Sequence, residues 1–554
     1  MLRSFTALCT ASLLAGAAHA VPPGFQDDAE AYLAGAYPAD APGAAVIVVE
    51  DGNVVFQQAR GLADIDDGTP LTPDTVFRLG SITKQFTAAA IMKLVEEGQI
   101  SLDHPVSKFL PDYPAPGADA TVRQLLNHTS GIQSYTGIPG WMVEENTARL
   151  YTTDELIAVF RDEPQQSPPG QAWAYNNSGY VLLGAILERV TGKPWDEVLE
   201  REIAQPLGLE TIRDGQDEAA MPNMAQGYTR SPEGEWMPAQ AIHMSVPQAA
   251  GALVGTVGDL AGWAKALHGG EVVTPASYRQ MTTATAVPDQ DEPVPYGFGL
   301  FVDQLLGRPM IGHGGGIFGF STDSLYIPEE DLFVAVFANA DTPVTAPSTA
   351  LQQLAAMAMG AEQLSWEAQP LDMAAVEPLF GVYDLGDEET RRFYERDGKL
   401  YTLRSGSSAL EVLPVEGGRF AYADGSLSWF TFDTSGEAPV MVVHERGNPE
   451  GTRAAYAGPI PDETPAVELP ADALSLYPGT YSLGPAQVVV SESEGSLSAQ
   501  ITGQPPFGLR PVGEHEFEVT DVDARLVFDV AEGKATGLTV FQAGQEIPAQ
   551  RVSD

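Results

Sequence analysis

Three short motifs carry residue types that can perform acyl transfer, and the first is Ser81-Ile82-Thr83-Lys84. It places a hydroxyl and an amine about one helical turn apart, where a lysine kept neutral can take the serine proton. The same four residues also suit an ordinary helix start with Ser81 near the N-cap. The motif therefore indicates a nucleophile and its base only when other motifs for the same chemistry accompany it.

The second motif is Tyr175-Asn176-Asn177, which follows a Pro-Pro-Gly turn and precedes an apolar helical stretch. A tyrosine at such a position can act as a phenolate or as a proton relay, and Asn177 can donate a hydrogen bond to an acyl amide. A capping or turn element is the structural alternative.

The third motif is His313-Gly314-Gly315-Gly316, directly before an expected strand. Its glycines let a substrate backbone approach the edge of a sheet, and His313 can point into the same cleft. Gly314, Gly316 and Gly319 also spell G-x-G-x-x-G, but a strand rather than a helix follows, which argues against a dinucleotide site. A structural turn remains the alternative.

The elements that must position these motifs can be read from hydrophobic periodicity. We expect a hairpin over 44–60, helices over 81–98, 153–161 and 179–191, and strands over 320–327 and 332–339. Strands at both ends with helices between them predict one α+β domain, which we assign to residues 21–365.

Two stretches rich in proline and acidic residues, 362–377 and 458–465, are expected to be linkers. The sequences that follow them repeat at an offset of 97 or 98: Gly381-Val382-Tyr383 with Gly479-Thr480-Tyr481, Pro414-Val415 with Pro511-Val512, and Phe420 with Phe517. This repeat predicts two copies of a small antiparallel barrel or sandwich, at 366–462 and 463–554.

Together the three motifs resemble those of the serine hydrolases of the penicillin-binding protein and class C β-lactamase family. That family carries S-x-x-K, Y-x-N and a third motif of lysine type or H-x-G, matched here by Ser81/Lys84, Tyr175/Asn177 and His313/Gly315. The resemblance covers about residues 25–360. It implies a β-lactamase-like α+β fold, in which an antiparallel sheet built from both chain ends lies beside a helical domain.

The resemblance also implies roles for individual residues. Ser81 would be the acylated nucleophile, with Lys84 and Tyr175 sharing the general-base and general-acid work. The backbone amides of Ser81 and Gly316 would form the oxyanion hole. The positions implied to bind substrate are Asn177, His313, Gly315 and Gly316, and the first two would also tune Lys84, whose neutral form is favoured by desolvation and by nearby positive charge.

The paired C-terminal modules resemble those of the three-domain D-aminopeptidases, in which two small barrels follow the catalytic domain. In those enzymes an acidic side chain on a loop of the last barrel holds the substrate amine. The matching stretch here, around Gln504 to Phe507, has no acid. Where the β-lactamases carry Lys-Thr-Gly, this chain has His313-Gly314-Gly315, which favours peptidase or esterase chemistry.

Composition and charge limit the kinds of partner that the chain is expected to bind. The chain has 75 acidic against 29 basic residues, a net charge of −46 that repels phosphate backbones, so no nucleic-acid partner is expected. No two histidines have H-x-x-x-H spacing, and neither a metal nor another cofactor is expected. No later apolar run approaches about 18 residues, so no membrane span is predicted. The oligomeric state is left open.

Residues 1–20 are typical of a cleavable secretory signal, with Arg3, an apolar run through Leu13-Leu14-Ala15, and Ala18-His19-Ala20 as an A-x-A site. A periplasmic or secreted protein starting at Val21 is therefore expected. Cys9 is the single cysteine and lies within this segment, so the mature chain would form no disulfide.

The sequence thus predicts an exported serine hydrolase that forms an acyl-enzyme and cleaves peptides or amides containing D-amino acids. An esterase or a weak β-lactamase of the same family is the first alternative. The second is a catalytically silent protein that binds a peptide or a cell-wall ligand.

Overall fold

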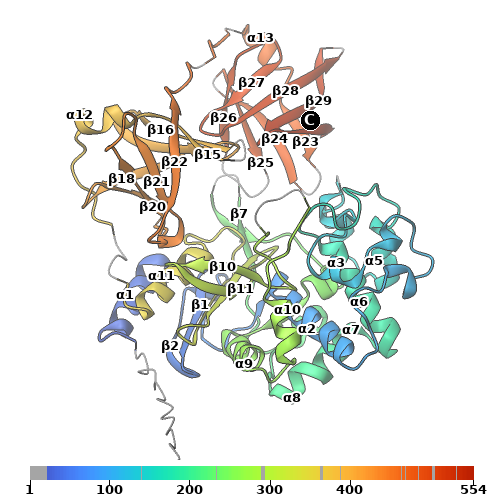
Figure 1. The fold of residues 1–554 in the computed structure, drawn as a ribbon. Helices are drawn as coiled ribbons and strands as arrows, with labels where there is room; N and C mark the ends of the chain where they lie inside the picture. Colours follow the sequence, from blue (N-terminus) through green and yellow to red (C-terminus); the bar gives the residue numbers. More distant parts are fainter. Residues whose placement is uncertain are drawn as a thin grey trace, which may run out of the picture.

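The chain folds into an α+β domain followed by two closed β-barrels, as seen in a computed structural model (Figure 1). The structure describes residues 21–553 except 139, 232–233, 289–292, 362–365, 387–388, 424, 463, 468, 484–485, 494, 502–505 and 532. The predicted fold class, a β-lactamase-like domain with two all-β modules, is confirmed. The predicted signal peptide, residues 1–20, lies outside the described residues.

A seven-stranded antiparallel sheet forms the centre of the α+β domain, in the order β10-β11-β13-β14-β1-β2, with β12 paired to β13. Its strands are β1 (Ala44–Glu50), β2 (Asn53–Arg60), β10 (Phe301–Leu305), β11 (Arg308–Gly312), β12 (Gly315–Ile317), β13 (Phe320–Ile327) and β14 (Leu332–Ala338). The pairing of β1 with β14 joins the two ends of the domain, as the sequence predicted.

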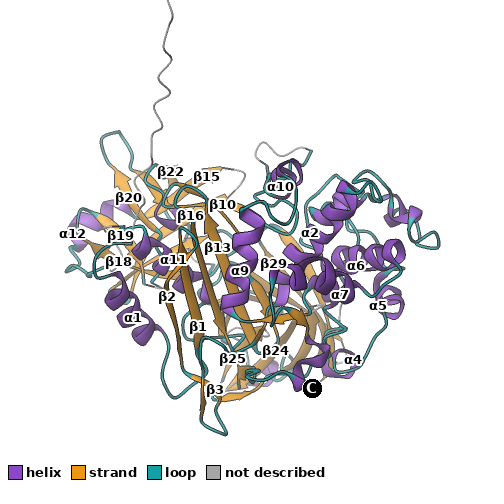
Figure 2. Cartoon of the chain, turned by 90° about the horizontal axis from the view of Figure 1, so that it is seen from below, coloured by secondary structure: helices purple, strands orange, loops and turns teal. Residues whose placement is uncertain are grey.

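Both faces of this sheet are buried. Alternate residues of β1 belong to two separate cores, because successive side chains of a strand point to opposite faces. One face is covered by α1 (Phe25–Ala36) and α11 (Pro347–Ala358), the other by α2 (Thr83–Glu96) and α9 (Val257–His268) (Figure 2). Continuous apolar strands such as β1 and β14 suit a sheet covered on both sides.

The helical part of the domain lies beside the sheet, at the right of Figure 1. Its helices are α3 (Val122–Leu126), α4 (Glu144–Thr147), α5 (Thr153–Phe160), α6 (Asn177–Thr191), α7 (Trp195–Leu199), α8 (Gln205–Leu207) and α10 (Pro275–Met281). α5 begins with a capping box, and α6 ends at Gly192 in the left-handed conformation. Among the described residues, no helix is long and apolar enough to cross a membrane.

The two C-terminal modules are closed antiparallel barrels of the same topology, β15 to β22 and β23 to β30. The first comprises β15 (Gly381–Gly386), β16 (Glu389–Arg396), β17 (Lys399–Arg404), β18 (Leu410–Val415), β19 (Arg419–Tyr422), β20 (Trp429–Asp433), β21 (Val440–His444) and β22 (Thr452–Gly458). The second comprises β23 (Gly479–Leu483), β24 (Ala486–Ser493), β25 (Ser496–Ile501), β26 (Phe507–Pro511), β27 (Glu516–Val519), β28 (Ala524–Ala531), β29 (Lys534–Gln542) and β30 (Gln545–Ser553). Tyr383 and Tyr481 occupy equivalent positions in their first strands, and each is fully buried in its own barrel core.

The segment expected to be a linker over 362–377 is partly structured. Its last described residues form α12 (Met373–Val376), and Val376 packs into the core of the first barrel. Burial of an apolar side chain of this size gains about 1.5–3 kcal/mol, which helps to hold this short helix against the barrel.

Specific contacts join the three parts. Arg446 of the first barrel pairs with Asp303 of β10, and its carbonyl accepts a hydrogen bond from the backbone N–H of Leu306 at 3.0 Å. Between the barrels, Arg396 pairs with Asp521, whose carbonyl accepts from the N–H of Ala409 at 2.7 Å. The first barrel therefore contacts both the α+β domain and the second barrel.

Candidate active site

Ser81 lies on a single 3₁₀ turn, Gly80–Ile82, that leads into α2. The residue before α2 is Ile82, and no side chain caps the helix, so the N-cap alternative for Ser81 does not describe this turn. Gly80 has φ 55°, a left-handed conformation that glycine adopts without steric cost. The turn leaves the Ser81 side chain partly exposed at the wall of a cavity.

Lys84 lies one turn further along α2 and is completely buried. Its Nζ is 3.1 Å from Oγ of Ser81, 2.8 Å from Oδ1 of Asn177 and 2.8 Å from the carbonyl oxygen of Ala250. Burial lowers the pKa of Lys84 well below its usual value, because desolvation disfavours the charged amine. The structure therefore brings together a hydroxyl and an amine that favours its neutral form.

Asn177 is the first residue of α6 and connects that helix to the site. Its Nδ2 donates to Oγ1 of Thr136 at 3.2 Å, and its backbone N–H donates to Oγ of Ser134 at 3.2 Å. These bonds orient the amide so that its oxygen faces Lys84.

Tyr175 covers the buried side of the lysine. Nζ of Lys84 lies 4.8 Å from the centre of the Tyr175 ring. Burial raises the pKa of Tyr175 above its usual value, while the nearby Ser81 hydroxyl acts in the opposite direction. Tyr175 is therefore a neutral phenol at ordinary pH, which fits a proton relay better than a phenolate base.

His313 is buried and held by two hydrogen bonds. Its Nδ1 lies 2.6 Å from the carbonyl oxygen of Gly314, which can only accept, so Nδ1 carries the proton. Its Nε2 then accepts from the hydroxyl of Tyr296 at 3.1 Å. Burial lowers the pKa of His313 to about 3, so the ring is neutral.

A neutral His313 supplies no positive charge to Lys84, in contrast to the tuning that the resemblance implied. Burial of the amine is the cause of the lowered Lys84 pKa. His313 instead holds the backbone at Gly314, directly before β12. The implied role of His313 in substrate binding stays a prediction.

Glycines let β12 approach the nucleophile closely. A Cβ on Gly80 would lie 3.0 Å from the backbone nitrogen of Gly316, and one on Gly315 would lie 2.0 Å from the carbonyl oxygen of Leu79. Gly316 itself is exposed to the cavity that Ser81 lines. The segment implied to supply an oxyanion donor therefore lies against the turn that carries Ser81.

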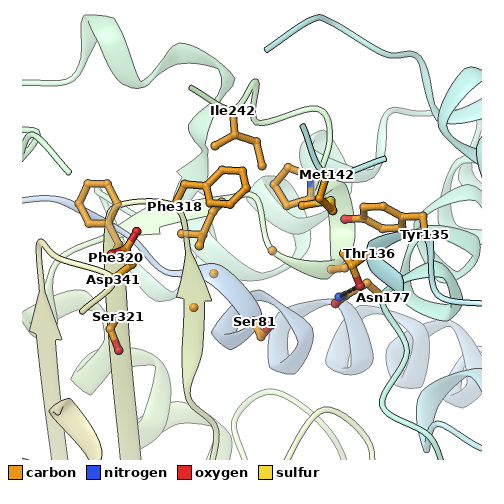
Figure 3. Close-up of a pocket in the computed structure, with 16 residues that line it drawn as sticks. Ser81, Tyr135, Thr136, Met142, Asn177, Ile242, Phe318, Phe320, Ser321 and Asp341 are labelled. Carbon is orange, nitrogen blue, oxygen red and sulfur yellow. Dashed lines mark hydrogen bonds between the residues drawn. The ribbon is translucent and has the colours of Figure 1, made fainter. Parts of the chain in front are cut away.

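The cavity has a volume of about 340 Å³ (Figure 3). It is lined by Gly80, Ser81, Tyr135, Thr136, Met142, Asn177, Ile242, Pro247, Ala250, Gly251, Gly316, Ile317, Phe318, Phe320, Ser321 and Asp341. Figure 3 shows Asp341 beside Phe320 on one side and Asn177 on the other, with Ser81 between them. Of these described lining residues, Asp341 alone has a carboxyl group, and none has a basic side chain.

Several residues at the site were not predicted from the sequence. Tyr296 donates a hydrogen bond to His313, and Asp341 lines the cavity. The His128 ring lies 4.4 Å from the Tyr175 ring, and its Nδ1 accepts a hydrogen bond from the N–H of Asn176 at 3.1 Å. No local sequence pattern marks Tyr296 or Asp341 as part of the site. Residues 502–505, which include part of the stretch matched to the amine-binding loop, lie outside the described residues.

Across the described ranges, no cluster of three or more His, Cys, Asp or Glu side chains could hold a metal ion.

A buried lysine beside a serine, with a tyrosine and a glycine-rich strand on this fold, is an arrangement that suits a serine hydrolase. Residues 31–358 match the protein family described as Beta-lactamase, and the chain belongs to that family. The prediction of a serine hydrolase of the β-lactamase and penicillin-binding protein family is confirmed.

Known relatives agree with this class. The chain is 28% identical over 476 residues to a D-aminopeptidase of Gluconobacter oxydans, covering 83% of this chain and 84% of the relative. It is 24% identical to penicillin-binding protein 4* of Bacillus subtilis, covering 73% of this chain and 93% of the relative. The solved structure of a D-stereospecific amidohydrolase from Streptomyces sp. is similar with a TM-score of 0.53 and 31% identity, covering 61% of this chain and 99% of that one.

Proposed function

We propose that the protein is an exported hydrolase that cleaves peptides or amides containing D-amino acids through an acyl-enzyme at Ser81. The observation that carries the proposal is the 3.1 Å approach of the buried Lys84 amine to Oγ of Ser81. The names of relatives, D-aminopeptidase and D-stereospecific amidohydrolase, support the substrate class. Export is supported by the signal-like composition of residues 1–20.

The hydrogen bonds of Lys84 define the direction of proton transfer. A neutral amine has two protons and one lone pair, and its neighbours at Asn177 Oδ1 and Ala250 O can only accept. Both protons are therefore engaged, and the lone pair faces the Ser81 hydroxyl. Lys84 is thus set to remove the proton of Ser81.

Acylation follows from this arrangement. Oγ of Ser81 attacks the substrate carbonyl while its proton moves to Nζ of Lys84. The N–H groups of Ser81 and Gly316 stabilise the resulting oxyanion. When the intermediate collapses, the C–N bond breaks and the leaving amine takes the proton of the Tyr175 phenol. Lys84 then returns to the phenol the proton that it took from Ser81. Water then attacks the ester, releasing the carboxylic acid and restoring the hydroxyl of Ser81.

The cavity adds information on the substrate. Its walls include the apolar side chains of Met142, Ile242 and Phe318, which suit an apolar substituent. Asp341 lies at one side, with Oδ2 accepting the N–H of Gly319 at 3.2 Å. A carboxylate in an otherwise uncharged cavity suits a substrate with a free ammonium group, as an aminopeptidase substrate has.

The test combines covalent labelling with stereochemistry. The parent protein and Ser81→Ala are incubated with a fluorophosphonate, and tryptic peptide 79–84 is analysed for the adduct. Hydrolysis of D- and L-amino acid p-nitroanilides and of p-nitrophenyl acetate is measured alongside. An adduct on that peptide and preference for the D-anilide support the proposal. Turnover of the acetate alone would indicate an esterase, and a parent protein without adduct would be a silent binder.

A further inference from the structure

The first barrel meets the α+β domain across a polar cleft of about 840 Å³. The cleft is separate from the cavity at Ser81, and the two share no lining residue. Strands β10 and β11 and helix α11 supply one wall, and the first barrel supplies the other through residues that include Arg391, Leu410, Tyr422 and Val443. The contact of Arg446 with Asp303 holds the two walls together.

Arg391 is a buried cation in the wall of this cleft. It lies on β16 two residues before Phe393, which belongs to the barrel core, so its side chain points to the barrel interior. Only 7% of the residue is exposed. Its Nη1 donates to the hydroxyl of Tyr422, and no described carboxylate forms an ion pair with it. Its Nε has no hydrogen-bond partner among the described residues.

A guanidinium in this position is costly for the fold. Arginine stays protonated at any working pH, so it cannot relieve burial by losing its charge. Burying a charge without a counter-charge is strongly unfavourable, and a neutral phenol offsets only part of that penalty. An oxyanion in the cleft would provide the opposite charge.

The second barrel has no arginine at the position equivalent to Arg391 and no tyrosine at the position equivalent to Tyr422. Arg391 is the register partner of Tyr383, and the equivalent partner of Tyr481 is Val488. Tyr422 pairs with Val412, and the equivalent pair in the second barrel is Val519 with Leu509. Two valines therefore replace the arginine and the tyrosine in a barrel of the same topology, and Val488 is fully buried there.

Neither of the described acidic residues that line the cleft pairs with Arg391. The carboxylate of Asp303 is engaged by Arg446. Glu445 is exposed, where solvent screens its charge. The apolar side chains of Leu410 and Val443 also line the cleft and could contact the carbon skeleton of a ligand.

We propose that this cleft binds a small organic anion through Arg391, which forms paired hydrogen bonds with a carboxylate or a phosphate group. The site would be an accessory ligand site outside the catalytic centre. It does not depend on the chemistry of Ser81, and its test succeeds or fails independently of the proposed hydrolase activity.

The test measures anion binding to the full-length protein by calorimetry, in the Ser81→Ala background and at constant ionic strength. The probes are citrate and inorganic phosphate, and citrate is expected to bind more tightly because phosphate has no carbon skeleton. Arg391→Val, which copies the second barrel, is expected to weaken binding at least tenfold. Arg404→Gln is the matched control, because this arginine is in the same barrel but is paired with Glu389 at the surface.

Two further measurements make the result decisive. Thermal unfolding without anion shows whether Arg391→Val retains the parent fold, and Arg391→Lys keeps the charge but not the planar fork, so intermediate affinity is expected. Equal binding to the parent and to Arg391→Val would overturn the proposal. The same conclusion follows if neither anion binds the parent protein.

Discussion

Oδ1 of Asn177 lies 2.8 Å from Nζ of Lys84, across 93 positions of sequence. The contact joins the start of α6 to the first turn of α2, and with Ala250 it leaves the lysine lone pair directed at Ser81. A neutral amide is essential to this geometry, because it accepts from Lys84 without placing a charge beside it.

Asn177→Asp is therefore expected to shift the pH dependence of activity. In the parent protein burial lowers the pKa of Lys84, so kcat/KM rises with pH through a value well below the usual lysine range. A carboxylate at 177 would favour the ammonium form and raise that pKa, which moves the ascending limb to higher pH. Thr136→Val is the control, since it removes the hydrogen bond from Nδ2 of Asn177 to Oγ1 of Thr136 without adding charge. An unshifted limb in Asn177→Asp would assign the titration to a group other than Lys84.

Lys84→Arg is expected to lose nearly all turnover while still binding substrate. A guanidinium keeps the positive charge but cannot accept the Ser81 proton. The acylation rate, followed by mass spectrometry of the fluorophosphonate adduct, is the measurement. Lys93→Arg makes the same exchange near the other end of α2 and is expected to acylate at the parent rate. Acylation of Lys84→Arg at that rate would leave Tyr175 as the sole base.

Gly80→Ala is expected to lower activity by about 100-fold, the effect of displacing one oxyanion donor. A Cβ at this position would lie 3.0 Å from the backbone nitrogen of Gly316 and push β12 away from Ser81. Gly98→Ala is a matched control, because Gly98 also has a positive φ, 72°, but has open space around it. Both variants are expected to lose about 1–2 kcal/mol of stability through left-handed strain. Equal activity in the two variants would show that β12 does not supply the donor.

Asp341→Asn is expected to raise KM about tenfold for a substrate with a free amine, the effect of losing about 1.4 kcal/mol from one charge-assisted contact. The asparagine can still accept from the N–H of Gly319, which preserves the local backbone. KM for the N-acetylated form of the same substrate is expected to stay unchanged. Asp112→Asn removes a charge from an exposed position of the same domain and serves as the control. A similar rise in KM for both substrates would argue against amine recognition.

The sequence by itself determined the local elements and the overall organisation. The expected helix over 153–161 is α5, which starts at the capping box of Thr152 and Glu155. The strands expected over 320–327 and 332–339 are β13 and β14, because two strand-forming runs around a short turn specify a hairpin within a few residues. The offset of 97 or 98 marked the repeated barrels, since equal spacing of buried positions produces equal strand order.

Tertiary structure decided the chemical state of the residues that the motifs marked. Lys84 is shifted toward its neutral form because helices and loops from distant parts of the chain exclude water around it, which no local pattern reveals. His313 is neutral and turned to Gly314 because Tyr296 and burial define its tautomer. Asp341 lines the cavity and Arg391 lines the cleft because segments far apart in the sequence pack together there. Desolvation and side-chain direction depend on contacts between segments far apart in sequence, and only the folded chain brings those segments together.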